Sequence, residues 1–311
     1  MSPLPHQTAT AEAPCSIGNV ATGFDILGHT IEGPSDRVLV RRIEEPLLRL
    51  CSVTGVVLDL PKDPTRNTAL RALAALRVRR GLAFGFEIDI VKGIPLGSGM
   101  GGSAACAVAA LVAANATLDD PLSVLELYPC ALEGEAAASG GRHGDNVGAM
   151  LLGGLTLSTH DRLVRLPVPT GLTCALVHPH FVLETRRARE ALEMPYAISD
   201  FVPQSERLAQ LMVGLFTRDL DSIRAGLDDV LVEPRRAHLI PGFAAVKRAA
   251  LHAGALGASI SGGGPSVFAW FEDRVTAEAS TKALQAAFAG AGFDSDVFVS
   301  PVEGPKARLI S

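Results

Sequence analysis

Residues 91–116 read VKGIPLGSGMGGSAACAVAALVAANA, and the rest of the chain can be interpreted outward from them. Alternating apolar and polar residues over 84–91 predict a strand that enters this stretch. A glycine-dense loop follows, and the small residues of 104–116 predict a buried helix. Glycine lets the backbone approach a ligand closely, and the first turn of a helix presents unpaired N–H groups with a partial positive charge. The stretch therefore predicts an anion site, with phosphate as the usual anion.

Three kinds of ligand-binding loop are compatible with so many glycines. An ordinary phosphate loop, GxxxxGK[ST], is excluded because no lysine follows any of them. The spacing of Gly97, Gly99 and Gly102 fits a dinucleotide loop. However, Glu87 and Asp89 give the preceding strand a polar face, whereas a central strand of a doubly wound sheet is apolar on both faces. The third kind binds phosphate through backbone N–H groups, the helix start and a serine. A plain turn would need one or two glycines, not four.

The segment PLGSGMGGSAA, residues 95–105, resembles the phosphate loop of the GHMP kinases, P-x-x-x-G-L-G-S-S-A-A. Met100 replaces the usual leucine. Gly102 replaces the first of two serines, so Ser103 alone is left to reach a metal ion. The resemblance implies a loop that binds ATP together with Mg²⁺. The implied ATP-binding residues are Pro95, Leu96, Gly97, Ser98, Gly99, Met100, Gly101, Gly102, Ser103, Ala104 and Ala105.

The composition limits the function classes. The chain has 311 residues, a net charge of −5 and 48% hydrophobic residues, which favours one large or two globular domains. Lys and Arg form no long run, which argues against nucleic acid as a partner. The five cysteines are widely spread without a C-x-x-C pair, as is typical of reduced, buried thiols in a cytoplasmic protein. No signal-peptide or membrane-spanning run is visible, so we expect no membrane partner.

The block APCSIGNVATGFDILG, residues 13–28, follows what we expect to be a loose leader over residues 1–12. On residue type alone, Asn19 and Asp25 would be turn formers. The block resembles the first motif of the homoserine kinase branch of the GHMP kinases, P-x-[ST]-x-x-N-x-G-x-G-F-D-x-L-G. The resemblance makes Asn19 and Asp25 candidate substrate contacts. Asp25 is also the candidate general base, if the reaction needs one.

Further elements follow from periodicity and caps. Residues 36–43 and 47–60 predict strands. Asn67 or Thr68 is expected to cap a helix that ends near residue 80, and the family resemblance places Asn67 near the adenosine. After the buried helix of residues 104–116, Asp120-Pro121 predicts the start of a further helix. The apolar run 149–157 predicts a strand.

The segment GEAAASGGRHGDN, residues 134–146, gathers polar groups in a glycine-flanked loop after a helix. Its spacing resembles the homoserine kinase pattern G-E-x-x-A-S-G-x-x-H-x-D-N. The resemblance implies that Glu135 joins Ser103 in holding Mg²⁺, a cation that prefers a carboxylate, a hydroxyl, waters and phosphate oxygens. It also implies that His143 and Asn146 contact the substrate, with Asp145 beside them.

A linker at residues 165–171 predicts two lobes, 1–165 with the phosphate loop and 166–311 with substrate arginines. Residues 172–178 predict a buried strand, and Thr185 is a candidate helix cap. Two further segments resemble the patterns T-x-x-A-R and E-P-x-R of homoserine kinases. The resemblance implies that Thr185, Arg189 and Arg236 contact the substrate, and that Arg235 does not. Residues 254–270 resemble the third GHMP motif, a strand, a glycine turn and a strand. The implied fold is α+β, with a ribosomal S5 domain 2-like N-terminal lobe and a ferredoxin-like C-terminal sandwich.

The resemblance implies ATP-dependent phosphorylation of the side-chain hydroxyl of L-homoserine, a step in threonine biosynthesis. The catalytic residues would be Ser103, Glu135 and Asp25. An amino-acid substrate has an ammonium group, which Asp25, Asn19 and Asn146 could bind, and a carboxylate, which two arginines could bind. The alternatives are a mevalonate-, shikimate- or sugar-type GHMP kinase and a non-catalytic nucleotide-binding regulator. We include a homodimer among the expected assemblies.

Overall fold

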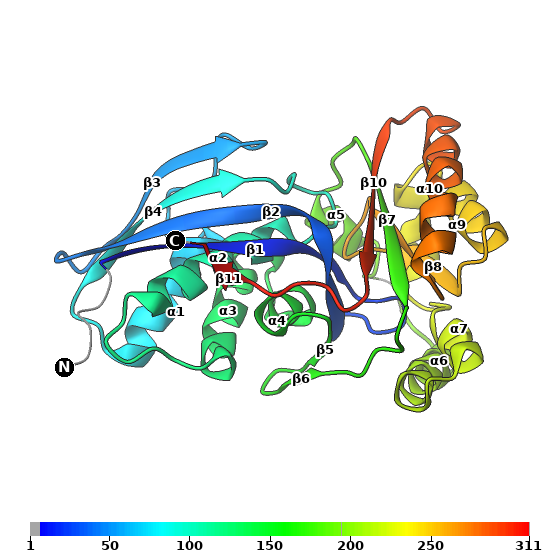
Figure 1. Cartoon of the computed structure of the whole chain (residues 1–311), viewed down its shortest axis with the longest axis horizontal. Coiled ribbons are helices and arrows are strands. Elements are labelled where there is room, and N and C mark those ends of the chain that lie inside the picture. Colours follow the sequence, from blue (N-terminus) through cyan, green and yellow to red (C-terminus); the bar gives the residue numbers. More distant parts are fainter. Residues whose placement is uncertain (1–6, 194, 311) are drawn as a thin grey trace.

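The computed structural model describes residues 7–193 and 195–310, which form two lobes, each a β-sheet with helices packed on it (Figure 1). The first sheet has the strand order β11-β1-β2-β4-β3, and β5 and β6 extend it from β2. Helices cover one of its faces. The first-lobe elements are β1 (Thr8–Gly18), β2 (Leu27–Ile43), β3 (Leu48–Gly55), α1 (Thr68–Arg80), β4 (Gly85–Lys92), α2 (Gly102–Ala116), α3 (Val124–Ser139), α4 (Asp145–Leu152), β5 (Leu155–Ser158), β6 (Leu163–Arg165) and β11 (Arg308–Leu309).

The start of the chain departs from the sequence expectation. The prediction of a loose leader is wrong for residues 8–12, because they begin strand β1, which pairs with β2 from Thr8 opposite Arg41. Small apolar residues at every second position, Ala9, Ala11 and Ala13, face the core and explain this strand. The predicted leader at residues 1–6 lies outside the described residues.

Strand β4, which leads into the glycine loop, has the predicted polar face. Its acidic residues Glu87 and Asp89 pair with Arg49 and Arg41 of the neighbouring strands on the solvent side. Its residues Phe86, Ile88 and Ile90 are buried on the opposite face, toward the helices. The strand runs antiparallel to β2, so it does not belong to a doubly wound parallel sheet.

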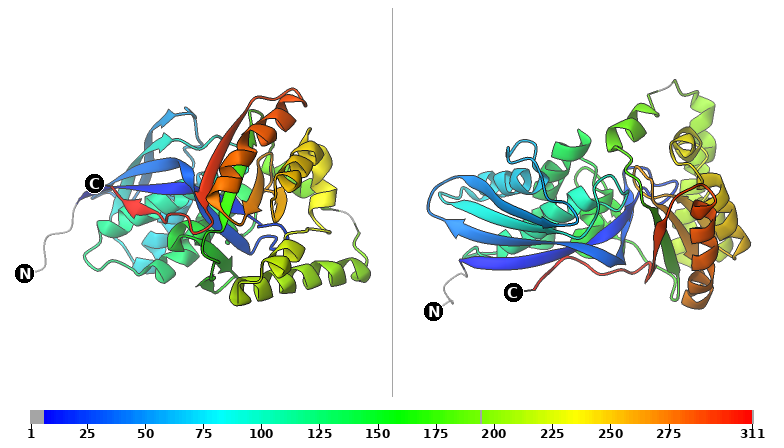
Figure 2. Two further views of the ribbon diagram at one scale, coloured as in Figure 1. Left: turned by 45° about the vertical axis from the view of Figure 1, so that its right-hand side comes forward. Right: turned by 90° about the horizontal axis from the view of Figure 1, so that it is seen from above.

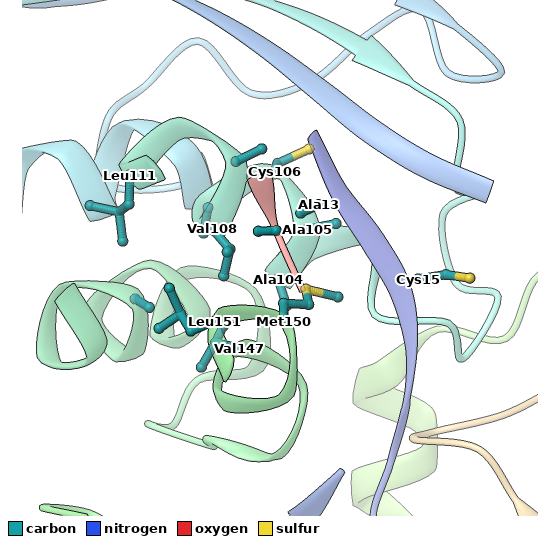
Figure 3. Close-up of a cluster of buried hydrophobic side chains, with 14 of the residues drawn as sticks. Ala13, Cys15, Ala104, Ala105, Cys106, Val108, Leu111, Val147, Met150 and Leu151 are labelled. Carbon is teal, nitrogen blue, oxygen red and sulfur yellow. The ribbon is translucent and has the colours of Figure 1, made fainter. Parts of the chain in front are cut away.

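Helix α2, which leaves the glycine loop, is the predicted buried helix. Alanines let it lie close to strand β1 on one side and to helix α4 on the other. Figure 3 shows Ala104, Ala105 and Val108 of α2 beside Ala13 of β1 and Met150 of α4. Because most of the helix is buried, packing on all sides fixes the direction of its N-terminus.

The second lobe has the predicted ferredoxin-like arrangement. Its core elements follow one another as β7-α9-β8-β9-α10-β10, with α5 to α8 and η1 inserted between β7 and α9, and its antiparallel sheet has the order β10-β7-β9-β8. Strand β7 is buried along its whole length, as its apolar run predicted. The second-lobe elements are β7 (Thr173–Pro179), α5 (Thr185–Glu190), α6 (Ile198–Thr217), α7 (Leu220–Gly226), α8 (Glu233–Arg236), η1 (Ala237–Leu239), α9 (Phe243–His252), β8 (Gly257–Ile260), β9 (Val267–Phe271), α10 (Arg274–Ala289) and β10 (Ser295–Pro301).

The lobes are joined by more than a linker. After β10 the chain returns to the first lobe, where β11 pairs with β1 (Figure 2). At the boundary, the indole N–H of Trp270 in β9 donates to Nε2 of His29 in β2 at 3.1 Å. Helices α6 and α7, which the sequence analysis did not anticipate, reach the first lobe where Thr22 Oγ1 donates to the carbonyl of Gly226. The division at residue 165 stays a prediction.

Several predicted boundaries were wrong. The helix expected at Asp120-Pro121 begins at Val124, because Ser123 and Glu126 form a reciprocal capping box. The apolar run 149–157 is not one strand. It contains the end of α4, a break at two glycines with positive φ, and then β5. Strand β3 ends at Gly55 rather than residue 60, and Thr185 is the first residue of α5 rather than its cap.

Candidate active site

The glycine loop forms a bend between β4 and α2. Gly97, Gly99 and Gly101 all have positive φ angles, of 60°, 77° and 72°. A Cβ at Gly99 would lie 2.5 Å from the carbonyl oxygen of Ser261, in the glycine turn between β8 and β9. Glycine is therefore required at residue 99 both for its backbone angle and for this close approach.

Serine hydroxyls of the second lobe hold the glycine loop by donating to the loop's carbonyl groups. Ser261 Oγ donates to the carbonyl of Gly99 at 2.7 Å, and Ser266 Oγ donates to that of Ser98 at 2.6 Å. The first residues of α2, where N–H groups lack intrahelical partners, line a cleft between the lobes. The predicted anion site is thus a rigid bend with a helix N-terminus at its end.

This cleft, of about 780 Å³, brings most of the predicted site residues together. Met100 and Ala105 do not line it. They are buried behind the loop and serve its packing. Asn67 lines an adjoining cavity instead. The predicted residues that line the cleft are Asn19, Asp25, Pro95, Leu96, Gly97, Ser98, Gly99, Gly101, Gly102, Ser103, Ala104, Glu135, His143, Asp145, Asn146, Thr185, Arg189 and Arg236.

The adjoining cavity lies where β4, α1 and α2 meet. Its walls include Leu60, Pro61 and Leu96, which are apolar, together with Asn67 and Ser103. Asn67 has a structural role as well, because its side chain accepts from the N–H of Leu70 and caps α1. Since Leu96 and Ser103 line both spaces, one elongated ligand could occupy the two together.

Within the same cleft, Asp25 is the centre of a charged cluster. Arg189 donates two hydrogen bonds to its carboxylate, at 2.8 and 2.7 Å, and His143 Nδ1 lies 3.1 Å from Oδ2. Burial raises the pKa of Asp25, but the hydrogen bonds from His143 and Arg189 outweigh it and lower the pKa to about 2. Asp25 is therefore ionised throughout the physiological pH range.

Asn19, Asp145 and Asn146 form a second polar cluster beside the first. The Asn19 N–H donates to Asp145 Oδ2 at 3.0 Å, and Asn19 Nδ2 donates to the carbonyl of Gly262 at 2.7 Å. Burial, with the nearby charge of Asp25, raises the pKa of Asp145 to about 6. Ser16 Oγ donates to Asn146 Oδ1 at 2.7 Å, and among the described residues no acceptor is bound to the amide nitrogen, the donor end of Asn146.

Arg236 brings a buried positive charge to the cleft. Its guanidinium donates to the carbonyls of Ala188, at 2.8 Å, and Gly262, at 3.3 Å. No carboxylate pairs with it among the described residues. Burial, with the charge of Arg189, lowers its pKa to about 10. Phe24 lies near both guanidiniums, 5.0 Å from that of Arg236.

Sequence reasoning missed two site-supporting groups. Ser16 and Phe24 match positions of the first motif within residues 13–28, but their contacts could not be inferred from it. Lys92 and Asp36, which form a fully buried ion pair behind the loop, were not noticed. A signal for Lys92 existed, because it continues the buried every-second-residue pattern of Phe86, Ile88 and Ile90, where a lysine needs a partner.

Known proteins resemble the chain over most of its length. The family model for the GHMP kinases N terminal domain matches residues 67–154, and that for GHMP kinases C terminal matches residues 211–290. The homoserine kinase of Xanthomonas campestris pv. campestris (strain B100) is 57% identical over 303 residues, 97% of this chain and 94% of the relative. That of Xylella fastidiosa (strain M12) is 55% identical over 99% and 96%. The crystal structure of homoserine kinase from Cytophaga hutchinsonii matches with a TM-score of 0.93 at 40% identity, covering 98% of each chain.

Proposed function

The chain belongs to the homoserine kinases of the GHMP kinase superfamily, and from this premise we propose that it phosphorylates the side-chain hydroxyl of L-homoserine with ATP. The product would be O-phospho-L-homoserine, for threonine biosynthesis. The predicted two-lobed GHMP kinase fold and the assignment as a kinase are confirmed. The roles of individual residues remain proposals, supported by the geometry of the cleft.

The observation that carries the substrate proposal is the pairing of opposite charges at one end of the cleft. Asp25 and Arg189 neutralise each other, and Arg236 lies nearby without a carboxylate of its own among the described residues. A zwitterionic amino acid offers an ammonium group to Asp25 and a carboxylate to the two arginines. Neither Asp25 nor Arg189 would then be left as a lone charge. An alcohol with only a carboxylate, such as mevalonate, would bring no ammonium group to Asp25, which would keep only Arg189 and His143 as partners.

The other end of the cleft suits the triphosphate of ATP. The N–H groups at the start of α2 and its dipole would bind the phosphates, and the adjoining cavity with Asn67 would hold the adenosine. The set Ser103 and Glu135 fits Mg²⁺, because a hydroxyl and a carboxylate in the same cleft leave room for phosphate oxygens and waters. Bound there, Mg²⁺ would neutralise charge on the β- and γ-phosphates. Among residues 7–193 and 195–310, no cluster of three or more acidic, histidine or cysteine side chains could hold a metal without such a ligand.

Catalysis would then rest on alignment and charge neutralisation. His143 and the amide nitrogen of Asn146 would orient the substrate hydroxyl toward the γ-phosphate, with Asp145 and Asn19 fixing the loop around them. Thr185 would close the cleft from α5. With a pKa of about 2, Asp25 is a poor proton acceptor at neutral pH, so we assign it to ammonium binding rather than to base catalysis. A loose transition state needs little deprotonation before attack.

The experiment that tests the proposal is an assay of ADP release against a panel of alcohols. The panel contains L-homoserine, mevalonate, shikimate and galactose, each with ATP and Mg²⁺, and phosphorus NMR identifies the product. We expect L-homoserine to be preferred by at least about 100-fold in kcat/KM, because rejected substrates leave charged groups unpaired. Turnover of mevalonate without homoserine would refute the substrate assignment. Nucleotide binding without any turnover would favour the regulator.

Location and assembly belong to the proposal too. All five cysteines are free, and only Cys51 is exposed, which corrects the expectation that all would be buried. Free thiols support a cytoplasmic location. Within the described part of the chain, none of the helices combines the length and apolar character needed to cross a membrane. A homodimer stays a prediction, which light scattering of the purified protein tests.

A further inference from the structure

Directly behind the glycine loop lies a buried ion pair to which the reaction assigns no role. Lys92, the last residue of β4, and Asp36 of β2 are both completely inaccessible, and Nζ of Lys92 donates to Oδ2 of Asp36. Cys106 of α2 completes the cluster, with Sγ 3.5 Å from the Lys92 ammonium and 3.3 Å from the Asp36 carboxylate. The cluster lies between the strand that enters the loop and the helix that leaves it, and Lys92 and Cys106 also form part of the wall of the adjoining cavity.

The hydrogen bonds of this pair reach both ends of the loop. The second carboxylate oxygen of Asp36, Oδ1, accepts from the N–H groups of Gly93, at 2.9 Å, and Ile94, at 3.0 Å, where the chain enters the loop. The Lys92 ammonium donates to the carbonyl of Gly102, at 2.9 Å, where α2 begins. Entry and exit are therefore connected through one lysine and one aspartate.

Stability alone does not account for such a pair. Removing two charges from water is unfavourable, and replacing a buried ion pair by apolar residues is often neutral or stabilising. The same two strands could be joined on this face by an apolar pair, as they are at Val38 and Ile90. What an apolar pair could not do is bind a backbone carbonyl on one side and two N–H groups on the other.

We propose that Lys92 and Asp36 are positioning residues that set the width of the phosphate loop and aim the start of α2 at the triphosphate. They act through the backbone of residues 93–94 and 102, and neither side chain is required to touch the phosphates. This inference rests on the proposed function, because it assumes that the loop binds the triphosphate.

The decisive variant is the double substitution Lys92→Met/Asp36→Asn. Asparagine keeps an acceptor for the N–H groups of Gly93 and Ile94, and methionine fills the lysine volume without leaving a lone charge. The matched control is Arg41→Met/Asp89→Asn, a cross-strand ion pair of the same two strands on the solvent face. Calorimetric titration with a non-hydrolysable ATP analogue and Mg²⁺ measures nucleotide affinity, and thermal melting measures the fold.

We expect the double variant to fold with a melting temperature close to that of the wild type. Its affinity for the analogue should fall at least about 10-fold and its kcat about 10- to 100-fold, because small misplacements of a reacting group have effects of this size. Homoserine affinity should change less than twofold, and so should every constant of the control. The single variant Lys92→Met should melt at a lower temperature, because it leaves the Asp36 carboxylate buried alone.

Two outcomes would overturn the inference. One is a folded double variant with wild-type nucleotide affinity and kcat, which would make the pair merely structural. The other is an equal loss of nucleotide and homoserine affinity, which would indicate a general change of the cleft. If the wild-type protein bound the analogue but did not phosphorylate homoserine, the proposed function would fail, while the nucleotide titration would still test the loop.

Discussion

The two adjacent arginines of α8 show how one position along a helix separates a site residue from a surface residue. Arg236 is buried and points into the cleft, whereas Arg235 lies over the ring of Tyr196 and 3.5 Å from Asp200. Of these two neighbours, only Arg236 lines the cleft, where we propose that it binds a substrate carboxylate. The two neighbours therefore form a natural pair of test and control.

We predict that Arg236→Met raises the KM for homoserine by about 10- to 100-fold, because a charge-assisted hydrogen bond contributes about 1.5–3 kcal/mol. The KM for ATP should change little. Arg235→Met should leave both constants within about twofold, since surface contacts of this kind contribute little. Steady-state kinetics on both variants provides the measurement, and equal effects of the two substitutions would contradict the assignment.

Glu135 is a second residue whose proposed role, the binding of Mg²⁺ through its carboxylate, can be tested separately from folding. We predict that Glu135→Gln lowers kcat by about 10²–10³-fold, the usual effect of losing one electrostatic contact to the reacting group. Gln keeps the size of the side chain, so the melting temperature should not change. A titration of activity with Mg²⁺ should show that the variant needs a higher Mg²⁺ concentration than the wild type for half-maximal activity. Wild-type kcat at saturating Mg²⁺ would rule out the proposed metal role.

At the scale of elements, the phosphate loop depends on the glycine turn of the other lobe. Gly99→Ala would place a methyl group 2.5 and 2.8 Å from the carbonyl oxygens of Ser261 and Gly264. We predict that it separates the two loops and reduces kcat/KM for ATP by about 100-fold. Gly292→Ala is the matched control, because Gly292 also has a positive φ but has no atoms within 4 Å of the added carbon. It should cost about 1–2 kcal/mol of stability, measured by denaturant unfolding, without affecting activity.

How far the sequence predicted these elements depended on whether the signal was local. The glycine loop and its helix were predicted, and the cap of α1 was narrowed to Asn67 or Thr68, because spacing and side-chain type determine these features. The start of α4 was missed because a short apolar run fits a helix or a strand equally well. Strand β1 was missed because alternating alanines are a weak pattern. The ion pair of Lys92 with Asp36 joins residues 56 positions apart, a contact that one sequence does not contain.

In the candidate site, too, residues were predicted where a local motif identifies them, and contacts between distant residues were missed. Motif resemblance brought together residues from both lobes that only the fold makes neighbours, and most of them line one cleft. It did not indicate that Asp25 and Arg189 pair with each other, or that Met100 and Ala105 are packing residues. A motif identifies residue types at a site, whereas hydrogen-bond partners depend on the three-dimensional packing of several elements.

For the whole molecule, the boundary between the lobes contains a titratable contact. His29 is fully buried, and its two ring nitrogens are both used. Nδ1 lies 3.0 Å from the carbonyl of Thr30, so it carries the proton, and Nε2 accepts from the indole N–H of Trp270. A protonated ring could no longer accept that hydrogen bond. Burial accordingly lowers the pKa of His29 to about 4, although the hydrogen bond to Thr30 opposes the shift.

This contact predicts how stability depends on pH. Because the pKa of His29 is about 4 in the folded protein and about 6.5 in the unfolded chain, the unfolded chain binds the proton first as the pH falls. The contribution of His29 to stability is therefore complete above about pH 6.5, decreases as the pH falls to about 4, and reaches a loss of about 3 kcal/mol. The contribution of Asp145 to stability changes in the opposite sense. Because its pKa is raised in the folded protein, the folded state gains stability as the pH falls from about 6 to 4.

The two effects must be separated by a variant. His29→Gln keeps a donor and an acceptor but does not titrate, so the difference between its denaturant unfolding curves and those of the wild type isolates the histidine. We expect this difference to change with pH between 6.5 and 4 and to be constant above 7. A difference that stays the same across the whole range would show that His29 does not couple the lobes to protonation.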